Sequence, residues 1–196
     1  MAVLTITADY DVNFWWDGSS SYNKRDAADY GYLGSGGKGS DFNRQALRFP
    51  LNDLPADANI TQVRLYVYNR TAGGVSHLTD IHAYGTNGQD NPYDDNAQTG
   101  WGRCASGNLY LDDSTALRTT GDKWFTLGGN VITDVSAAKN AVNRFSLGLH
   151  EEGDNDTYAK IAVLEDNLYP AKLEITYTEA VATKRIICDG LVCIIS

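Results

Sequence analysis

Residues 62–69 read Gln-Val-Arg-Leu-Tyr-Val-Tyr-Asn, and apolar side chains alternate with more polar ones along them. A period of two is typical of a β-strand with one buried face. Similar short runs recur along the chain, at residues 3–7, 46–49, 80–84, 123–127, 145–149, 160–164 and 172–177. Clusters of Gly, Asn, Asp and Ser lie between them, as at 34–40 and 85–88. This pattern predicts an all-β protein with a β-sandwich or jelly-roll fold.

Only one segment has helical spacing. Within residues 131–142, the apolar residues Ile132, Val135, Ala138 and Val142 fall on one helical face. We expect one or two helical turns across one end of the sandwich. Neither a repeat nor a linker divides residues 1–178. We therefore predict one jelly-roll domain over 1–178, with a connector and an assembly hairpin over 179–196.

A run of short motifs resembles a known family. Residues 44–55 read RQALRFPLNDLP, and ANIT (58–61) and RLYV (64–67) follow. This order resembles the core signature of the DNRLRE-type jelly-roll domains. Residues 124–135, 145–149 and 170–177 are similar to later steps of that family, whereas Pro50 replaces its usual Asp and 179–196 has no counterpart. The resemblance implies a jelly roll, which occurs in carbohydrate-binding modules, cell-surface repeats and phage structural proteins.

The carboxy-terminal residues differ in character from the rest. Asp189-Gly190 is a strong signal for a two-residue type I′ hairpin turn. Such a turn pairs Cys188 with Leu191, Ile187 with Val192 and Ile186 with Cys193. Because Cys188 and Cys193 are then not opposite each other, we expect no disulfide between them.

This predicted hairpin has no polar face. A two-stranded hairpin alone is marginal in water, and an uncovered apolar one aggregates. We expect its own sandwich to cover one side and a neighbouring subunit the other; the alternative is a hairpin folded wholly onto its own domain. The predicted assembly interface comprises Ile186, Ile187, Leu191, Val192, Ile194 and Ile195.

Charge and composition exclude several classes of partner. The chain has 16 Lys and Arg against 25 Asp and Glu, a formal net charge of −9, which disfavours nucleic-acid binding. No apolar run approaches the roughly 18 residues of a membrane helix. The first residues lack the basic and apolar regions of a secretory signal, and three cysteines are an odd count. We therefore predict synthesis in the cytoplasm, without a disulfide framework.

The sequence does not predict an active site. The three histidines, His77, His82 and His150, are far apart, and none lies near a Gly-x-Ser-x-Gly turn. No pair of carboxylates stands out for glycoside hydrolysis. The glycine-rich residues 34–40 depart from a phosphate loop, because Tyr32 and Gly39 occupy two of its required positions. We interpret 34–40 as a surface loop and the protein as non-enzymatic, without a cofactor.

An acidic segment is a candidate calcium site. Glu152, Asp154 and Asp156 place carboxylates at alternating positions, and Ca²⁺ takes about six to eight oxygen ligands. The alternative is an acidic hairpin loop that is simply solvated, because the EF-hand spacing is absent.

Aromatic residues are candidates for stacking on sugars. Trp15 and Trp16 are adjacent, so in an extended strand they point to opposite faces and one is left for a ligand. Trp124 lies in a strand pattern and is expected in the core.

Together these features favour a virion structural protein. A virion subunit is made in the host cytoplasm yet acts outside the cell, which fits free cysteines and a fold typical of extracellular modules. We expect a bacteriophage capsid decoration protein or another head or tail accessory subunit, bound to other virion subunits or to copies of itself. The alternative is an extracellular carbohydrate-binding module or surface adhesin with a glycan as partner.

Overall fold

The computed structural model of the chain describes residues 1–25, 30–36, 41–72, 76–151, 158–162, 168–179, 184–188 and 191–195. These residues are mostly β, as the sequence predicts. The strands are β1 (Ala2–Thr7), β2 (Tyr10–Trp16), β3 (Tyr22–Arg25), β4 (Tyr30–Gly36), β5 (Asp41–Pro50), β6 (Asn59–Thr71), β7 (Thr79–Ala83), β8 (Leu109–Ser114), β9 (Gly121–Thr126), β10 (Arg144–Glu151), β11 (Tyr158–Ala162), β12 (Lys172–Thr178), β13 (Lys184–Cys188) and β14 (Leu191–Ile195). The helices are α1 (Ala97–Arg103), the 3₁₀ turn η1 (Ala116–Arg118) and α2 (Val131–Ala141).

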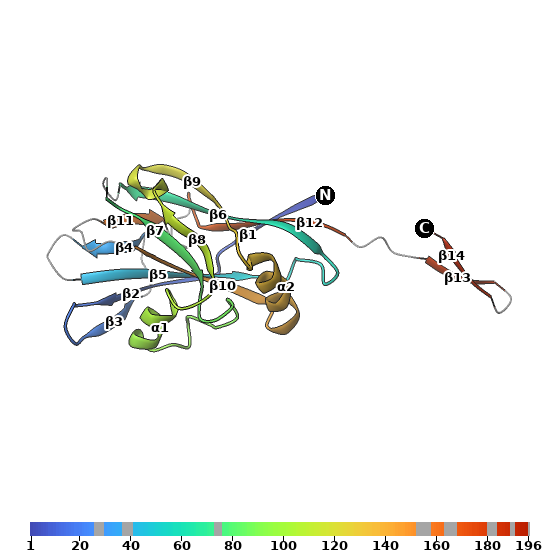
Figure 1. The fold of residues 1–196 in the computed structure, drawn as a ribbon, viewed down its shortest axis with the longest axis horizontal. Helices are drawn as coiled ribbons and strands as arrows, with labels where there is room; N and C mark the ends of the chain where they lie inside the picture. The colour runs from blue at the N-terminus through green and yellow to red at the C-terminus, as the bar shows by residue number, and fades with distance from the viewer. Residues whose placement is uncertain are drawn as a thin grey trace.

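Twelve strands form one antiparallel sheet. Its main path runs β1-β12-β6-β11-β4-β5-β10-β7-β8, with β9 paired to β6, and with β2 paired to both β5 and β3. The sheet curls strongly, so that β6 and β12 lie across the molecule from β5 and β10 (Figure 1).

The main core fills the inside of this curl. Strand β12 alternates strictly, and Leu173, Ile175 and Tyr177 point inward. They belong to the same buried cluster as Leu47 of β5 and Leu147 of β10, which are fully buried. The period of two in the sequence therefore marks one continuous hydrophobic core.

Helix α2 closes one end of the core with most of the predicted face, since Val142 also packs against the core. Val131, Val135 and Ala138 are buried, whereas Ile132 is 37% exposed. The helix also spans three turns rather than one or two. The prediction was wrong about Ile132 because the helix begins at Val131, which is itself a core residue.

A second, smaller core lies on the outer face of β2 and β5. Val12, Phe14, Ala46, Tyr84 and Cys104 form it. Helix α1 covers this face at Gly100, where an added Cβ would lie 2.2 Å from the Phe14 ring. The sequence did not predict α1, because two glycines within its seven residues weaken any helical signal.

Three further expectations need correction. Strands β2, β3, β4 and β8 lie outside the predicted runs. Gly34–Gly36 end strand β4 rather than belonging to a loop. Trp124 is 41% exposed on β9, where the Arg64 guanidinium lies 4.5 Å from its ring, so it is not a core residue.

The last two strands form a sheet of their own. β13 and β14 pair with each other in the predicted register: Cys188 opposite Leu191, Ile187 opposite Val192, and Ile186 opposite Cys193. Figure 1 draws this hairpin beyond the end of β12. The turn at 189–190 and the connector at 180–183 lie outside the described residues. None of the described helices is long and apolar enough to span a membrane.

Candidate functional site

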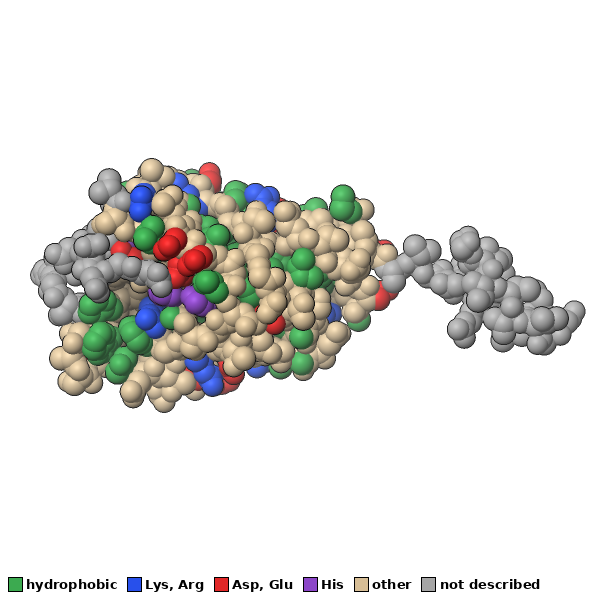
Figure 2. Space-filling model, in the orientation of Figure 1, with side chains coloured by type: hydrophobic (Ala, Val, Ile, Leu, Met, Phe, Trp, Pro, Cys, Tyr) green, Lys and Arg blue, Asp and Glu red, His purple; other side chains and the backbone are tan. Residues whose placement is uncertain are grey.

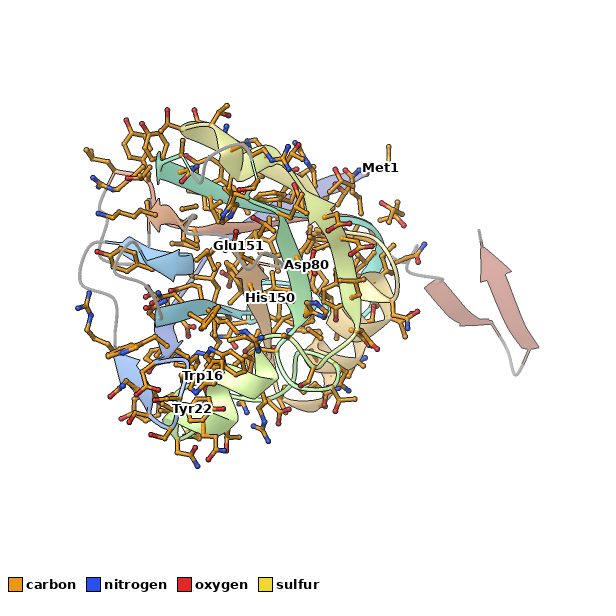
Figure 3. The ribbon with its side chains drawn as sticks, turned by 60° about the vertical axis from the view of Figure 1, so that its left-hand side comes forward. Met1, Trp16, Tyr22, Asp80, His150 and Glu151 are labelled. Atoms are coloured by element: carbon orange, nitrogen blue, oxygen red, sulfur yellow. The ribbon has the colours of Figure 1, made fainter. Side chains whose placement is uncertain are left out.

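His82 and His150 meet on the outer face of the sheet, although 68 residues separate them. β7 and β10 are antiparallel neighbours, with Asp80 opposite His150 and His82 opposite Gly148. Because side chains alternate along a strand, Asp80, His82 and His150 share one face while Ile81 and Leu149 enter the core. Figure 3 shows Asp80 and His150 close together on these two strands.

The two imidazole rings face each other through their Nε2 atoms, which are 3.1 Å apart. On the far side of each ring, Nδ1 contacts a backbone carbonyl. His82 Nδ1 lies 3.1 Å from the oxygen of Gly107, and His150 Nδ1 lies 3.2 Å from that of Glu151. A carbonyl oxygen only accepts hydrogen bonds, so each Nδ1 carries the hydrogen and donates it.

Carboxylates surround this pair of rings. Asp80 Oδ2 lies 3.5 Å from His150 Nε2, and Asp80 Oδ1 accepts a hydrogen bond of 2.8 Å from the Asp113 amide. Asp112 and Asp113 lie on β8, where the pairing with β7 is irregular and turns both carboxylates toward Asp80. Figure 2 shows the histidines at the surface beside a group of acidic side chains.

The surroundings keep His150 uncharged at neutral pH. Burial and the nearby positive charge of Arg44 together lower the pKa of His150 to about 4. Arg44 approaches from β5, with its guanidinium 3.4 Å from the Trp101 ring and a 2.8 Å hydrogen bond to the Trp101 carbonyl.

Two groups of side chains among the described residues could hold a metal ion. One is Asp80 with His82 and His150, and the other is Asp80 with Asp112 and Asp113.

The backbone at Cys104 packs directly on this face. A Cβ at Gly148 would lie 2.4 Å from the Cys104 carbonyl oxygen, so only glycine fits opposite His82. Cys104 is itself fully buried, and burial raises the pKa of its thiol. Its side chain is therefore a packing group rather than a nucleophile.

His77 is not part of this cluster. Its ring is fully buried, with Nε2 3.0 Å from the Thr79 hydroxyl and Nδ1 3.5 Å from Glu151 Oε1. Glu151 extends to the opposite face of β10 from His150, because the two residues are adjacent in the strand. Only two of the three histidines come together.

A row of aromatic rings crosses β3, β2 and β5. Trp16 lies directly opposite Tyr22 and Phe42, with ring centroids 6.1 and 5.4 Å away and interplanar angles of 19° and 27°. Trp101 of α1 tilts against Trp16 and Tyr22. These four half-buried rings form the aromatic row, whose Trp16 and Tyr22 are labelled in Figure 3.

The other predicted site residues are not brought into one place. Trp15 is half-buried and extends to the face of β2 opposite Trp16, so the two do not form a joint platform. Glu152, Asp154 and Asp156, the predicted calcium ligands, lie outside the described residues. The predicted interface residues lie on β13 and β14, whose side chains are also outside the described part.

The histidine–aspartate cluster was missed from the sequence. One signal was present: Asp80 and His82 are two residues apart in a predicted strand, and residues so spaced share a face. The partner His150 is fixed only by the register between β7 and β10, which the sequence does not reveal.

Comparisons with known proteins add no family. No protein-family model matches the chain, and no curated protein matches it significantly.

Proposed function

We propose that this protein is a non-enzymatic structural subunit of a bacteriophage virion, such as a capsid decoration protein or another head or tail accessory subunit. In this proposal residues 1–178 are a jelly-roll body of the DNRLRE type, and the carboxy-terminal hairpin attaches it to neighbouring subunits. The observation in its support is that β13 and β14 pair with each other in a separate sheet while their sequences are almost entirely apolar.

The hairpin needs a partner for physical reasons. In the observed register the three pairs nearest the turn join apolar residues only, and Ile194 and Ile195 extend the apolar run. Because successive strand residues alternate between faces, such a ribbon has no polar face by sequence. Burying each aliphatic side chain is worth roughly 1.5–3 kcal/mol, so several together suffice for a stable attachment.

The body, in contrast, has its own core. Its buried cluster joins side chains from Ile6 on β1 to Tyr177 on β12. Deleting residues 184–196 should therefore leave a folded, soluble body that melts cooperatively. The same deletion should abolish co-sedimentation with particles of the encoding phage and any self-association seen by light scattering. An unfolded body, or one that still joins the particle, would contradict the proposal.

Glycan binding is the second candidate, and the aromatic row is the observation in its favour. Aromatic rings cover the apolar faces of sugars, and the indole nitrogen of Trp101 is buried without a hydrogen-bond partner among the described residues. Yet Trp16 stacks on Tyr22 and Phe42, which covers ring faces that a sugar would need.

A glycan array with the purified chain distinguishes the two candidates. Signals at background level are expected from the virion proposal. The glycan candidate would be favoured instead by binding that is lost in Trp16→Ala and retained in Trp124→Ala. Trp124 serves as the control because its exposed ring lies outside the row.

A further inference from the structure

We infer that Asp80, His82 and His150 bind a divalent transition-metal ion, of which Zn²⁺ is the representative, through the two Nε2 atoms and the Asp80 carboxylate. This site is independent of the virion proposal and of the candidate calcium segment at 152–156.

The two imidazole rings have too few hydrogens to supply all four of their nitrogen atoms. Two neutral imidazoles carry two N–H groups, and both are used at Nδ1, on the carbonyls of Gly107 and Glu151. No hydrogen remains for the Nε2 atoms, which are nevertheless 3.1 Å apart with a carboxylate oxygen 3.5 Å from one of them. Lone pairs that face one another repel unless a cation lies between them.

The distance between the two Nε2 atoms also fits a shared metal ion. Two nitrogen ligands at about 2.0–2.1 Å from a metal ion lie about 2.8–3.4 Å apart, from octahedral to tetrahedral coordination. The observed 3.1 Å between the Nε2 atoms falls in this range. Metal-binding histidines also commonly donate their other N–H to a carbonyl, which fixes the ring, and both rings do so here. The three ligand atoms all lie within 4.8 Å of one another.

The ligand set favours a transition metal over calcium. Imidazole nitrogen suits Zn²⁺, Cu²⁺, Ni²⁺ and Fe²⁺, whereas Ca²⁺ takes oxygen ligands. The positive charge of Arg44 opposes a cation here, but Asp80, Asp112 and Asp113 supply three nearby carboxylates. A water molecule or an Asp112 or Asp113 oxygen would complete the coordination.

The direct test uses the full-length, tag-free wild-type chain. With ¹⁵N labelling, long-range ¹H–¹⁵N spectra report each of the three imidazoles while Zn²⁺ is added at pH 7. We expect the Nε2 signals of His82 and His150 to shift together and saturate at one equivalent, while His77, the internal control, stays unchanged. Absence of any shift, a shift of only one of the pair, or shifts that do not saturate at one equivalent would overturn the inference.

Variants give a second, matched test. Asp80→Asn keeps an oxygen for the Asp113 amide but weakens the metal ligand, whereas Asp57→Asn makes the same change at an exposed turn. By calorimetric titration Asp80→Asn and His150→Gln should each lower Zn²⁺ affinity at least tenfold, and Asp57→Asn should not change it. Excess Ca²⁺ should not compete. Equal affinities in all variants, or displacement of Zn²⁺ by Ca²⁺, would refute the site; if the site variants do not fold, the wild-type spectra decide.

Discussion

His150 shows how one side chain links the packing of the sheet to its electrostatics. His150 is 7% exposed and faces Asp80 and His82 on β7. The positive charge of Arg44 on β5 contributes to the lowered pKa of its ring. Since burial and Arg44 both penalise the imidazolium, the folded state holds this ring neutral. In the unfolded chain the same residue regains a pKa near 6.5.

This difference predicts a pH dependence of stability. Between pH 6.5 and about 4 the unfolded chain binds a proton at residue 150 that the folded chain does not, so the free energy of unfolding falls as the pH is lowered through this window. The full loss is on the order of 3 kcal/mol. Urea unfolding with EDTA present, at pH 7 and pH 4.5, measures it.

Comparison with His150→Gln isolates the contribution of this ring, because Asp80, His82, Asp112 and Asp113 are present in both proteins. We expect the variant to lose much less stability between pH 7 and pH 4.5 than the wild type. Equal losses in the two proteins would show that His150 is not the group responsible.

The buried thiol of Cys104 gives a second prediction, which concerns its chemical reactivity. Its thiol is fully buried and its pKa is raised by burial, so it stays protonated and inaccessible. Maleimide labelling of the native chain followed by peptide mapping should leave Cys104 unmodified, and labelling in denaturant should modify it. Rapid native labelling of Cys104 would mean that the smaller core opens readily.

Among the elements, strand β12 was predictable from its period of two, whereas strand β2, which is covered on both faces, was not. The burial of β12 alternates strictly, whereas Val12, Asn13 and Phe14 of β2 are all buried, since α1 covers its outer side. A strand covered on both faces loses its period of two. The histidine–aspartate cluster could not be predicted from the sequence either. The pairing of β7 with β10, which are far apart in the sequence, brings His82 to His150.

Because the sheet packs closely against the backbone at Cys104, we expect alanine substitutions at Gly148 and Gly102 to have different effects on the free energy of unfolding. Gly148→Ala forces a Cβ against the Cys104 backbone, at 2.4 Å from its oxygen, and should lower the free energy of unfolding by about 1–3 kcal/mol. Gly102→Ala on α1 meets nothing within 4 Å and should be neutral or stabilising by up to about 1 kcal/mol. Chemical denaturation compares them, and equal effects would contradict the close packing at Gly148.

For the whole molecule, the central feature is the division between a body with its own core and a hairpin with its own sheet. The hairpin register was predictable, because the Asp-Gly turn fixes it. What covers the hairpin is not readable from one chain, since the proposed partner is another subunit. The proposed role in the virion therefore depends on this segment more than on any residue of the body.

A matched pair of substitutions tests that role most directly. Val192→Lys introduces a charge into the hairpin opposite Ile187, and Val3→Lys introduces the same charge on β1, where the valine is 60% exposed. The measurement is the fraction of added chain that co-sediments with particles of the encoding phage assembled without it. We predict that Val192→Lys loses binding at least tenfold while Val3→Lys binds like wild type. Undiminished binding of Val192→Lys, with the body folded in both variants, would contradict an attachment made through the hairpin.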